Sequence, residues 1–582
     1  NIFFYSMKEK QIYIVADSID SNLLVERNIN SETILTLTPD AFYILKDTDN
    51  NFIRSNELFT NTEHETVAKT VKEQESKLIQ EIEESNSLTL ITKEIFINQI
   101  HAALSVYYLI EHTIPDATLY KVYDDGEFLD FNQKKDACLC LINRLVKGHP
   151  FVMRTNKAWF PSLINKLNDI SSKILTRRNT YVFSTFFYGT PWISKEILKI
   201  DKHARFISFV STKGTRLDLL RSFGTIISIL LGMRFIKFII PYSISQKSNE
   251  FGELINNIQD KRLAEALKSF EESIIKRVEL ANSSSIQISK IIKNINPLCM
   301  IAHEMRSPMI LASAFAIKNH TIPVYLASHG THLSSENEII NLEQKSLARG
   351  ILASPIADYM IVQSDMSKDA MKKFYPDLRV LDYEHINWGY PNNYTEISSN
   401  EKIRFLHAST YKGMGSFRPW IFETSDEFHK SLSELIQVFN RVDNADLLIR
   451  HREIGEMSIN TYKDLIESKN QNIFIKTDLD NPFLEDLDSA DVVIANFSTT
   501  IEEAVSRGKY VILWGEGNRY SHENSPFMSQ ELVFPAYSIE ELYNNVNLIV
   551  KEIRKNKITS QKGKIDLKNS QKEFIKRIVS RH

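Results

Sequence analysis

Three hydroxyl side chains follow one strand-like run in the C-terminal part of the chain. Ser498, Thr499 and Thr500 stand between the apolar run 491–496 (DVVIAN) and the helix-like run 501–508 (IEEAVSRG). Backbone N–H groups at a helix N-terminus attract anions, and nearby hydroxyl groups add donors. We therefore predict a phosphate-binding turn. The alternative is helix capping by one hydroxyl, with a Glu three residues later, which accounts for one hydroxyl of the three.

A basic tripeptide ends another strand-like run of the same region. Arg450 and His451 close the run 446–451 (DLLIRH), and Arg452 follows. Guanidinium groups form paired hydrogen bonds with phosphate oxygens. These three side chains are therefore predicted to contact a phosphate or diphosphate, and a solvated basic loop is the alternative.

A histidine with a neighbouring glycine ends a third run. His329, Gly330 and Thr331 come shortly after 321–327 (TIPVYLA). The glycine lets a ligand approach the backbone closely, and the imidazole is a candidate general base or phosphate donor. A buried histidine beside a turn is the alternative. Earlier in the chain, Arg306 opens a helix-like run, where a cation opposes the helix dipole and indicates an anionic partner.

Adjacent carboxylates end a fourth run. Asp124 and Asp125 precede Gly126 after the strand-like sequence 118–123 (TLYKVY). A carboxylate at a strand tip can remove a proton from a sugar hydroxyl. Asp-Asp-Gly is also a common plain turn, and both interpretations stay open at this point.

Strand-like and helix-like runs alternate along much of the chain, most regularly from residue 297 onward. This alternation predicts parallel α/β units. A turn-rich cluster at 389–393 (GYPNN) indicates a boundary between two such domains with a cleft between them. The region of about 130–290 predicts a helical insertion in the first domain, and the basic end 551–582 predicts a helix.

One apolar stretch suggests a contact with membrane. Residues 223–244 are nearly long enough to span a bilayer, but Arg234 and Lys237 near the middle make a span improbable because buried cations are costly there. Basic residues upstream favour an element of about 200–247 that lies on an anionic inner membrane surface. The alternative is two buried strands or a core helix with the cations at their ends.

The composition excludes several classes. The 582 residues contain 70 Lys and Arg against 73 Asp and Glu, a net charge of −3, which argues against nucleic acid as a partner. Three cysteines cannot form a disulfide framework, and their spacing is poor for a metal. The first residues lack the pattern of a signal peptide, so we expect a cytoplasmic protein. No paired-carboxylate motif indicates a metal, and no cofactor is expected.

The ordered series of motifs from 297 to 515 resembles GT-B glycosyltransferases that build bacterial surface polysaccharides. The series reads IPVYLASHGTH, ADYMIVQSDMSKD, GYP, RFLHASTYKG, LLIRHRE, ADVVIANFSTTIEEA and KYVILWG. Its order is similar to that of capsule and teichoic-acid polymerases, and the Asp-Asp-Gly element resembles sialyl-, polysialyl- and Kdo-transferase-like enzymes. The family usually has His-Pro where this chain has His451 and Arg452.

The resemblance implies two Rossmann-type domains, with 1–390 binding an acceptor and 391–550 binding a nucleotide-sugar. It implies transfer of a sugar, best guessed as a CMP-activated nonulosonate or Kdo-type sugar, to a hydroxyl of a lipid-linked or surface glycan such as capsule polysaccharide or lipopolysaccharide. Asp125 or His329 would be the base. Donor-binding residues would be Arg450, His451, Arg452, Ser498, Thr499, Thr500 and Glu503, and cleft or acceptor residues would be Asp124, Arg306, Gly330 and Thr331. Enzymes of this kind generally need no metal.

Two other functions stay open. A CDP-polyol phosphotransferase of the teichoic-acid type shares the His-Gly-Thr element, and there His329 would be the base. A non-catalytic protein that binds a nucleotide-sugar and assists assembly at the membrane is the other.

Overall fold

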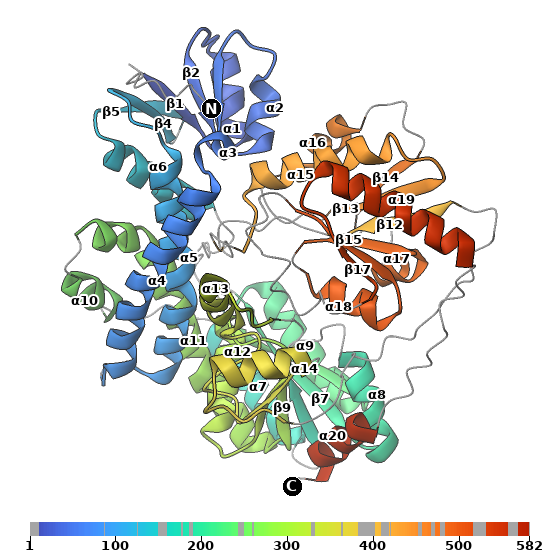
Figure 1. Cartoon of the computed structure of the whole chain (residues 1–582). Helices are drawn as coiled ribbons and strands as arrows, with labels where there is room; N and C mark the ends of the chain where they lie inside the picture. Colours follow the sequence, from blue (N-terminus) through green and yellow to red (C-terminus); the bar gives the residue numbers. More distant parts are fainter. Residues whose placement is uncertain are drawn as a thin grey trace.

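The structure is a computed structural model of the chain. It describes residues 11–86, 88–124, 126–148, 160–175, 179–184, 190–212, 214–241, 250–258, 261–327, 332–362, 365–381, 402–408, 418, 421–451, 457–466, 472–477, 483–496, 498–515, 531–556 and 569–580. Three β-sheets with associated helices organise these residues (Figure 1).

The N-terminal sheet has five strands in the order β3-β2-β1-β4-β5. All neighbours are parallel except β4 and β5, which form an antiparallel hairpin. The strands are β1 (Ile12–Val15), β2 (Thr33–Thr36), β3 (Asn51–Arg54), β4 (Tyr120–Asp124) and β5 (Glu127–Phe131). Helices of this region are α1 (Ser18–Glu26), α2 (Pro39–Leu45), α3 (Ser55–Leu58), α4 (Asn61–Glu84), α5 (Leu90–Thr113) and α6 (Lys134–Gly148).

The central sheet has six parallel strands in the order β11-β10-β9-β6-β7-β8. They are β6 (Thr180–Phe183), β7 (Arg205–Thr212), β8 (Phe235–Pro241), β9 (Cys299–Ala302), β10 (Val324–Ala327) and β11 (Tyr359–Ile361). The chain adds strands outward from β6 to one edge and then from β9 to the other. This is the doubly wound Rossmann order, and its switch point lies between β6 and β9.

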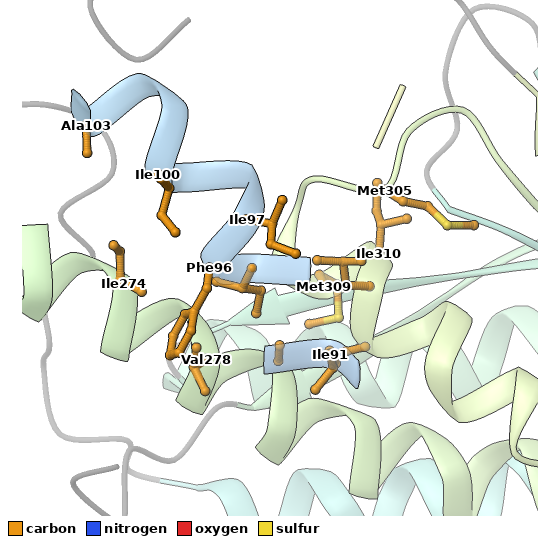
Figure 2. Close-up of a cluster of buried hydrophobic side chains, with 14 of the residues drawn as sticks. Ile91, Phe96, Ile97, Ile100, Ala103, Ile274, Val278, Met305, Met309 and Ile310 are labelled. Atoms are coloured by element: carbon orange, nitrogen blue, oxygen red, sulfur yellow. The ribbon is translucent and has the colours of Figure 1, made fainter. Parts of the chain in front are cut away.

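The helices of the central unit are α7 (Pro161–Leu175), α8 (Thr190–Ile200), α9 (Arg216–Leu230), α10 (Glu250–Asn257), α11 (Lys261–Ile295), α12 (Pro308–Lys318), α13 (Glu338–Ala348) and α14 (Asp365–Phe374). Side chains of α5 pack on two of them: Phe96 and Ile100 face Ile274 and Val278 of α11, and Met309 of α12 lies beside them (Figure 2). One hydrophobic core therefore continues from the N-terminal sheet through these helices to the central sheet.

The C-terminal sheet repeats the same topology. Its parallel strands are β12 (Ile403–His407), β13 (Ala445–His451), β14 (Ile473–Thr477), β15 (Val492–Ala495), β16 (Tyr510–Leu513) and β17 (Val533–Pro535). Their order is β14-β13-β12-β15-β16-β17, so the switch point lies between β12 and β15. Its helices are α15 (Ser425–Phe439), α16 (Ile459–Leu465), α17 (Phe483–Ser489), α18 (Thr499–Ser506) and α19 (Ile539–Asn556).

The α/β prediction with two Rossmann-type sheets is confirmed, but the N-terminal half is organised differently from the prediction. It holds two separate sheets, and the region expected to be a helical insertion supplies β6, β7 and β8 to the central one. The apolar stretch 223–244 is likewise not a single element, because it holds the end of α9 and all of β8. None of the helices in the described ranges has the length and apolar character needed to cross a membrane.

The basic end of the chain also differs from the single expected helix. Within 551–582 lie the end of α19 and a separate helix, α20 (Asn569–Ser580). Phe574 and Ile578 of α20 are buried in one cluster with Ile193 and Ile197 of α8. The chain therefore returns from the C-terminal unit to the central unit at its end (Figure 1).

The start of α15 binds the C-terminal unit to the N-terminal sheet. Arg54 Nη2 and Ser55 Oγ each donate to the Asp426 carboxylate, both at 2.6 Å. His64 Nε2 lies 3.0 Å from Glu427 Oε1. Because Asp426 is fully buried and Glu427 nearly so, these are interior contacts between units.

Candidate functional site

Two polar side chains meet at the switch point of the central sheet, on the carboxyl edge where α/β proteins bind ligands. Ser184 follows β6, and His303 follows β9. Ser184 Oγ lies 2.8 Å from His303 Nδ1, and the His303 backbone N–H donates to the same oxygen at 3.2 Å. The hydroxyl can donate to Nδ1 or accept a proton from it, depending on the tautomer of the ring.

Sequence reasoning did not select this pair. A polar residue at the end of an apolar run is the pattern that selected Ser498 and His451, and it would also have selected this pair. Ser184 and His303 are each the first polar residue after a buried apolar strand. His329, Gly330 and Thr331 lie outside the described residues. Their strand β10 is described, and it pairs with β9 so that Leu326 lies beside Ala302.

The carboxyl edge of the central sheet packs against the C-terminal unit. Leu333, two residues beyond Thr331, belongs to one buried cluster with Leu406 at the end of β12 and Ile501 in the first turn of α18. Met366 at the start of α14 packs on the same cluster. Leu333 and the start of α18 are therefore brought close together.

At the start of α18, the structure shows the capping arrangement. Ser498 is the N-cap, and its Oγ accepts from the Thr500 backbone N–H at 3.2 Å and donates to Thr500 Oγ1 at 3.0 Å. Thr499 opens the helix and is half-buried. Glu503 lies in the second turn, where its carbonyl accepts from Arg507 Nη1 at 2.9 Å. Capping thus explains two hydroxyls, and the phosphate-binding prediction for this turn stays a prediction.

Arg450 lies in the interior instead of on an open edge. It is 3% exposed, and Nη1 lies 2.5 Å from Asp486 Oδ2 of α17. Lys476 Nζ is 3.2 Å from the other oxygen of Asp486. The expectation that this guanidinium meets a donor phosphate is therefore corrected, since it has a buried protein carboxylate as its partner.

His451 is also buried, and it contacts its own domain. Nε2 lies 3.2 Å from the Met457 carbonyl oxygen, and the ring packs edge-on against Tyr462 with centroids 4.7 Å apart. Arg452 lies outside the described residues. The basic tripeptide therefore does not form a solvated basic loop at its first two positions.

The switch point of the C-terminal sheet holds a second histidine that sequence reasoning did not select. His407 ends β12 and is 2% exposed. Burial lowers its pKa to about 4, so the ring is neutral at pH 7. Asn496 follows β15, the strand next to β12. Its side-chain amide lies against Gly515, so a Cβ atom at position 515 would overlap that amide.

Arg306 has peptide carbonyls as partners instead of an anion. Nε donates to the Arg349 carbonyl at 3.0 Å, and Nη2 donates to the Leu347 carbonyl. These carbonyls belong to the C-terminal end of α13. Burial lowers the pKa of Arg306 to about 9. The helix-terminus argument is thus corrected, because the guanidinium caps a neighbouring helix.

The Asp-Asp-Gly element forms a hairpin in the N-terminal sheet. Asp124 is the last residue of β4 and pairs with Glu127 across the turn. Gly126 has φ of +102°, a conformation that favours glycine. Asp125 lies outside the described residues. The parallel strands of this sheet also reverse their order, between β1 and β4, so Asp124 lies at the carboxyl end of a strand beside that reversal and outside the switch points of the central and C-terminal sheets.

A cavity of about 640 Å³ lies away from these edges, between α4 and the region of α13 and α14. Its charged walls are paired within the protein: Arg349 Nη2 lies 2.7 Å from Glu94, and Glu75 lies 2.8 Å from His101. Over the described part of the chain, no group of three or more His, Cys, Asp or Glu could hold a metal ion. The prediction that no metal or cofactor is needed stays a prediction.

Residues 252–364 match the family model described as Glycosyl transferase 4-like. This segment runs from α10 to the end of β11, so it includes β9 and β10 of the central sheet. No curated protein matches the chain. Together with the two doubly wound sheets, the match supports a glycosyltransferase of the GT-B type.

Several solved structures resemble the chain at low identity. MnaA from S. aureus, solved with UDP, is 12% identical over 69% of this chain and 95% of its own, with a TM-score of 0.40. MurG from Acinetobacter baumannii is 11% identical over 69% and 99%, with a TM-score of 0.37. UGT71G1 from Medicago truncatula, solved with UDP-glucose, is 11% identical over 70% and 98%, with a TM-score of 0.39. All these TM-scores are below 0.5, and we draw no conclusion from the likenesses.

Proposed function

We propose that the protein is a nucleotide-sugar-dependent glycosyltransferase with its reaction centre between the central and C-terminal sheets. The observation that carries the proposal is the Glycosyl transferase 4-like segment within one of two doubly wound sheets. In the reaction, an acceptor hydroxyl attacks the sugar carbon, the bond from that carbon to the donor phosphate breaks, and the nucleotide leaves. The acceptor proton passes to a base.

The start of α18 is the proposed phosphate site. Its first backbone N–H groups lie at the positive end of the helix dipole, where the departing phosphate gains negative charge. The Ser498 cap fixes the entry of the chain into this helix. Thr499 and Thr500 belong to the proposed phosphate site. Arg450 does not, because it forms an ion pair with Asp486.

The central edge is the proposed source of the base. His303 is held by Ser184 at the switch point, and the segment containing His329 follows the strand next to it. A neutral imidazole can accept the acceptor proton near neutral pH. Asp125 is the weaker candidate, because its neighbours Asp124 and Gly126 belong to the hairpin of the N-terminal sheet.

The finer features of the reaction stay predictions. These are a CMP-activated nonulosonate or Kdo-type donor, a lipid-linked or surface glycan as acceptor, and a cytoplasmic location at the inner membrane surface. CMP, CDP, UDP and GDP are the ligands to be tested.

Thermal unfolding of the full chain with each nucleotide tests the proposal. A ligand at 100 times its dissociation constant adds about 2.7 kcal/mol of stability. Thr499→Glu is the informative variant, because an acid in the first turn favours the helix but repels a phosphate. Asn460→Glu places an acid in the first turn of α16 and is the matched control.

We expect one nucleotide to raise Tm for the unmodified chain and for Asn460→Glu, but not for Thr499→Glu. Selectivity for CMP would support the finer donor prediction, and selectivity for UDP or GDP would replace it. The absence of any shift with all four nucleotides would contradict the proposed function.

A further inference from the structure

Helix α9 has an apolar face that the protein leaves uncovered. Five large apolar side chains of this helix are 44–69% exposed: Leu217, Leu220, Phe223, Ile227 and Leu230. Their spacing places them along one side of the helix. The opposite side is buried, with Ser222, Thr225 and Ile229 turned inward, and Thr225 Oγ1 donates to the Lys237 carbonyl of β8 at 2.8 Å. The helix is thus firmly seated with its apolar stripe facing solvent.

The turn between α9 and β8 extends this stripe. Leu231 is 75% exposed, Met233 is 50% exposed and Phe235 is 40% exposed. Of the 18 large hydrophobic side chains that the structure describes as exposed, eight lie within 217–235. Single exposed apolar side chains are ordinary, but a contiguous patch of this kind marks an interaction surface. We call residues 216–235 the α9 patch.

Cations surround the α9 patch. Residues 202–237 contain seven lysines and arginines against one aspartate, in a chain whose net charge is −3. The aspartate, Asp218, is buried and caps α9, where it also pairs with Arg221 at 3.2 Å. The exposed basic residues are Lys202, Arg216, Arg221, Arg234 and Lys237. A partner of this patch must therefore offer negative charge beside an apolar interior.

We propose that the α9 patch docks on an anionic lipid bilayer. The apolar side chains would enter the boundary between headgroups and acyl chains, and the cations would lie at the lipid phosphates. A second copy of this chain fits less well, because it would bring two sets of cations together. The inference rests on the exposure and charge of the α9 patch and does not depend on the proposed activity.

Vesicle flotation of the full chain tests the proposal. The probes are phosphatidylcholine vesicles and vesicles that also contain phosphatidylglycerol. We expect partitioning into the anionic vesicles to be at least about tenfold stronger and to weaken with salt, since each basic residue near such a surface contributes about 1 kcal/mol. Binding to neither kind of vesicle would overturn the proposal.

Two sets of variants locate the contact. Leu220→Gln/Ile227→Gln/Leu231→Gln should reduce partitioning at least about tenfold, because it removes apolar side chains from the patch. Ile19→Gln/Ile286→Gln/Leu548→Gln changes three side chains elsewhere that are 45–62% exposed, and this variant should bind like the unmodified chain. Equal losses in both sets would overturn the proposal.

A charge variant and a test of self-association complete the design. Arg216→Gln/Arg221→Gln/Arg234→Gln should remove the preference for anionic vesicles, because these exposed cations supply it. Sedimentation without lipid should show that the chain does not self-associate through the α9 patch. If the unmodified chain self-associated and the patch variants did not, a second copy would be the partner of the patch and the lipid proposal would be overturned.

Discussion

Ser184 Oγ lies 2.8 Å from His303 Nδ1 at the point where the central sheet reverses its strand order. The two residues are separated by more than a hundred positions, and adjacent strands bring them together. This contact places the His303 imidazole at a ligand-binding edge of the sheet, within hydrogen-bond distance of a neighbouring hydroxyl.

The first prediction concerns this pair. We expect His303→Gln to lower kcat by about 10²–10⁴-fold with a small change in KM, as for loss of a general base. Ser184→Ala should lower kcat less and shift the pH profile, because it releases the imidazole. Steady-state kinetics with the identified donor measure both effects.

The matched control is another serine and histidine pair. Ser289 Oγ lies 2.9 Å from His320 Nε2, away from the carboxyl edge. His320→Gln should therefore keep kcat. An unchanged kcat in His303→Gln would remove this residue from the mechanism.

The second prediction concerns the buried pair of Arg450 and Asp486. Asp486→Asn should destabilise the fold by about 3 kcal/mol, because it leaves a buried guanidinium without its charged partner. Urea unfolding measures the loss. The double variant Arg450→Met/Asp486→Leu should recover most of it and still bind nucleotide.

Glu65→Gln removes the exposed pair of Glu65 and Lys69 and should change stability by less than about 1 kcal/mol. If the double variant folded well but lost nucleotide binding, Arg450 would return to the donor site.

The third prediction is a pH dependence of stability. Burial lowers the pKa values of His407 and His429 to about 4, below the unfolded value of about 6.5. Folding favours the neutral rings, so their contribution is complete above about pH 6.5 and declines as pH falls toward 4. Between these values each histidine should cost about 1 kcal/mol of unfolding free energy per pH unit.

Urea unfolding at several pH values checks this slope. His407→Asn should make it shallower, while His203→Asn, a change at an exposed position, should leave it as it is. If His407→Asn had the same dependence of unfolding free energy on pH as the unmodified chain, protonation of His407 would not destabilise the fold.

The fourth prediction concerns the coupling between units. Arg54 Nη2 lies 2.6 Å from the buried Asp426 carboxylate, which also accepts from Ser55. A double-mutant cycle with Arg54→Gln and Asp426→Asn should give a coupling energy of about 0.5–3 kcal/mol. The exposed pair of Lys402 and Asp446 lies within one unit and should give about 0–1 kcal/mol. A cycle with no coupling would mean that the pair of Arg54 and Asp426 does not stabilise the contact between the two units.

The fold was most predictable where strands are short, apolar and bounded by turns. The strand-like runs 118–123, 321–327, 446–451 and 491–496 became β4, β10, β13 and β15. The region of β6 to β8 was misread, because an apolar run such as 223–244 does not reveal whether it is one helix, one strand or both. Gly232 with its φ of +75° marks the turn between α9 and β8, but a glycine alone does not predict which elements it joins.

The site was predictable only in part, for a related reason. The cap at Ser498 is a local arrangement, and the sequence offered capping by one hydroxyl as the alternative to a phosphate-binding turn. The partners of Arg450 and Arg306 are set by tertiary packing, 36 and 41–43 positions away in sequence. Spacing alone therefore suggested a bound phosphate for Arg450 and an anionic partner for Arg306, where the fold supplies an Asp carboxylate and peptide carbonyls, respectively.

Hydrogen–deuterium exchange of the full chain with UDP, CMP, CDP or GDP tests whether a nucleotide binds at the C-terminal switch point. We predict that one nucleotide slows exchange of the backbone amides at 498–502, at the start of α18, and of those near His407. We predict no change in the hairpin of Asp124 and Gly126. Protection confined to that hairpin, or no protection with any of the four nucleotides, would contradict a donor site at the C-terminal switch point.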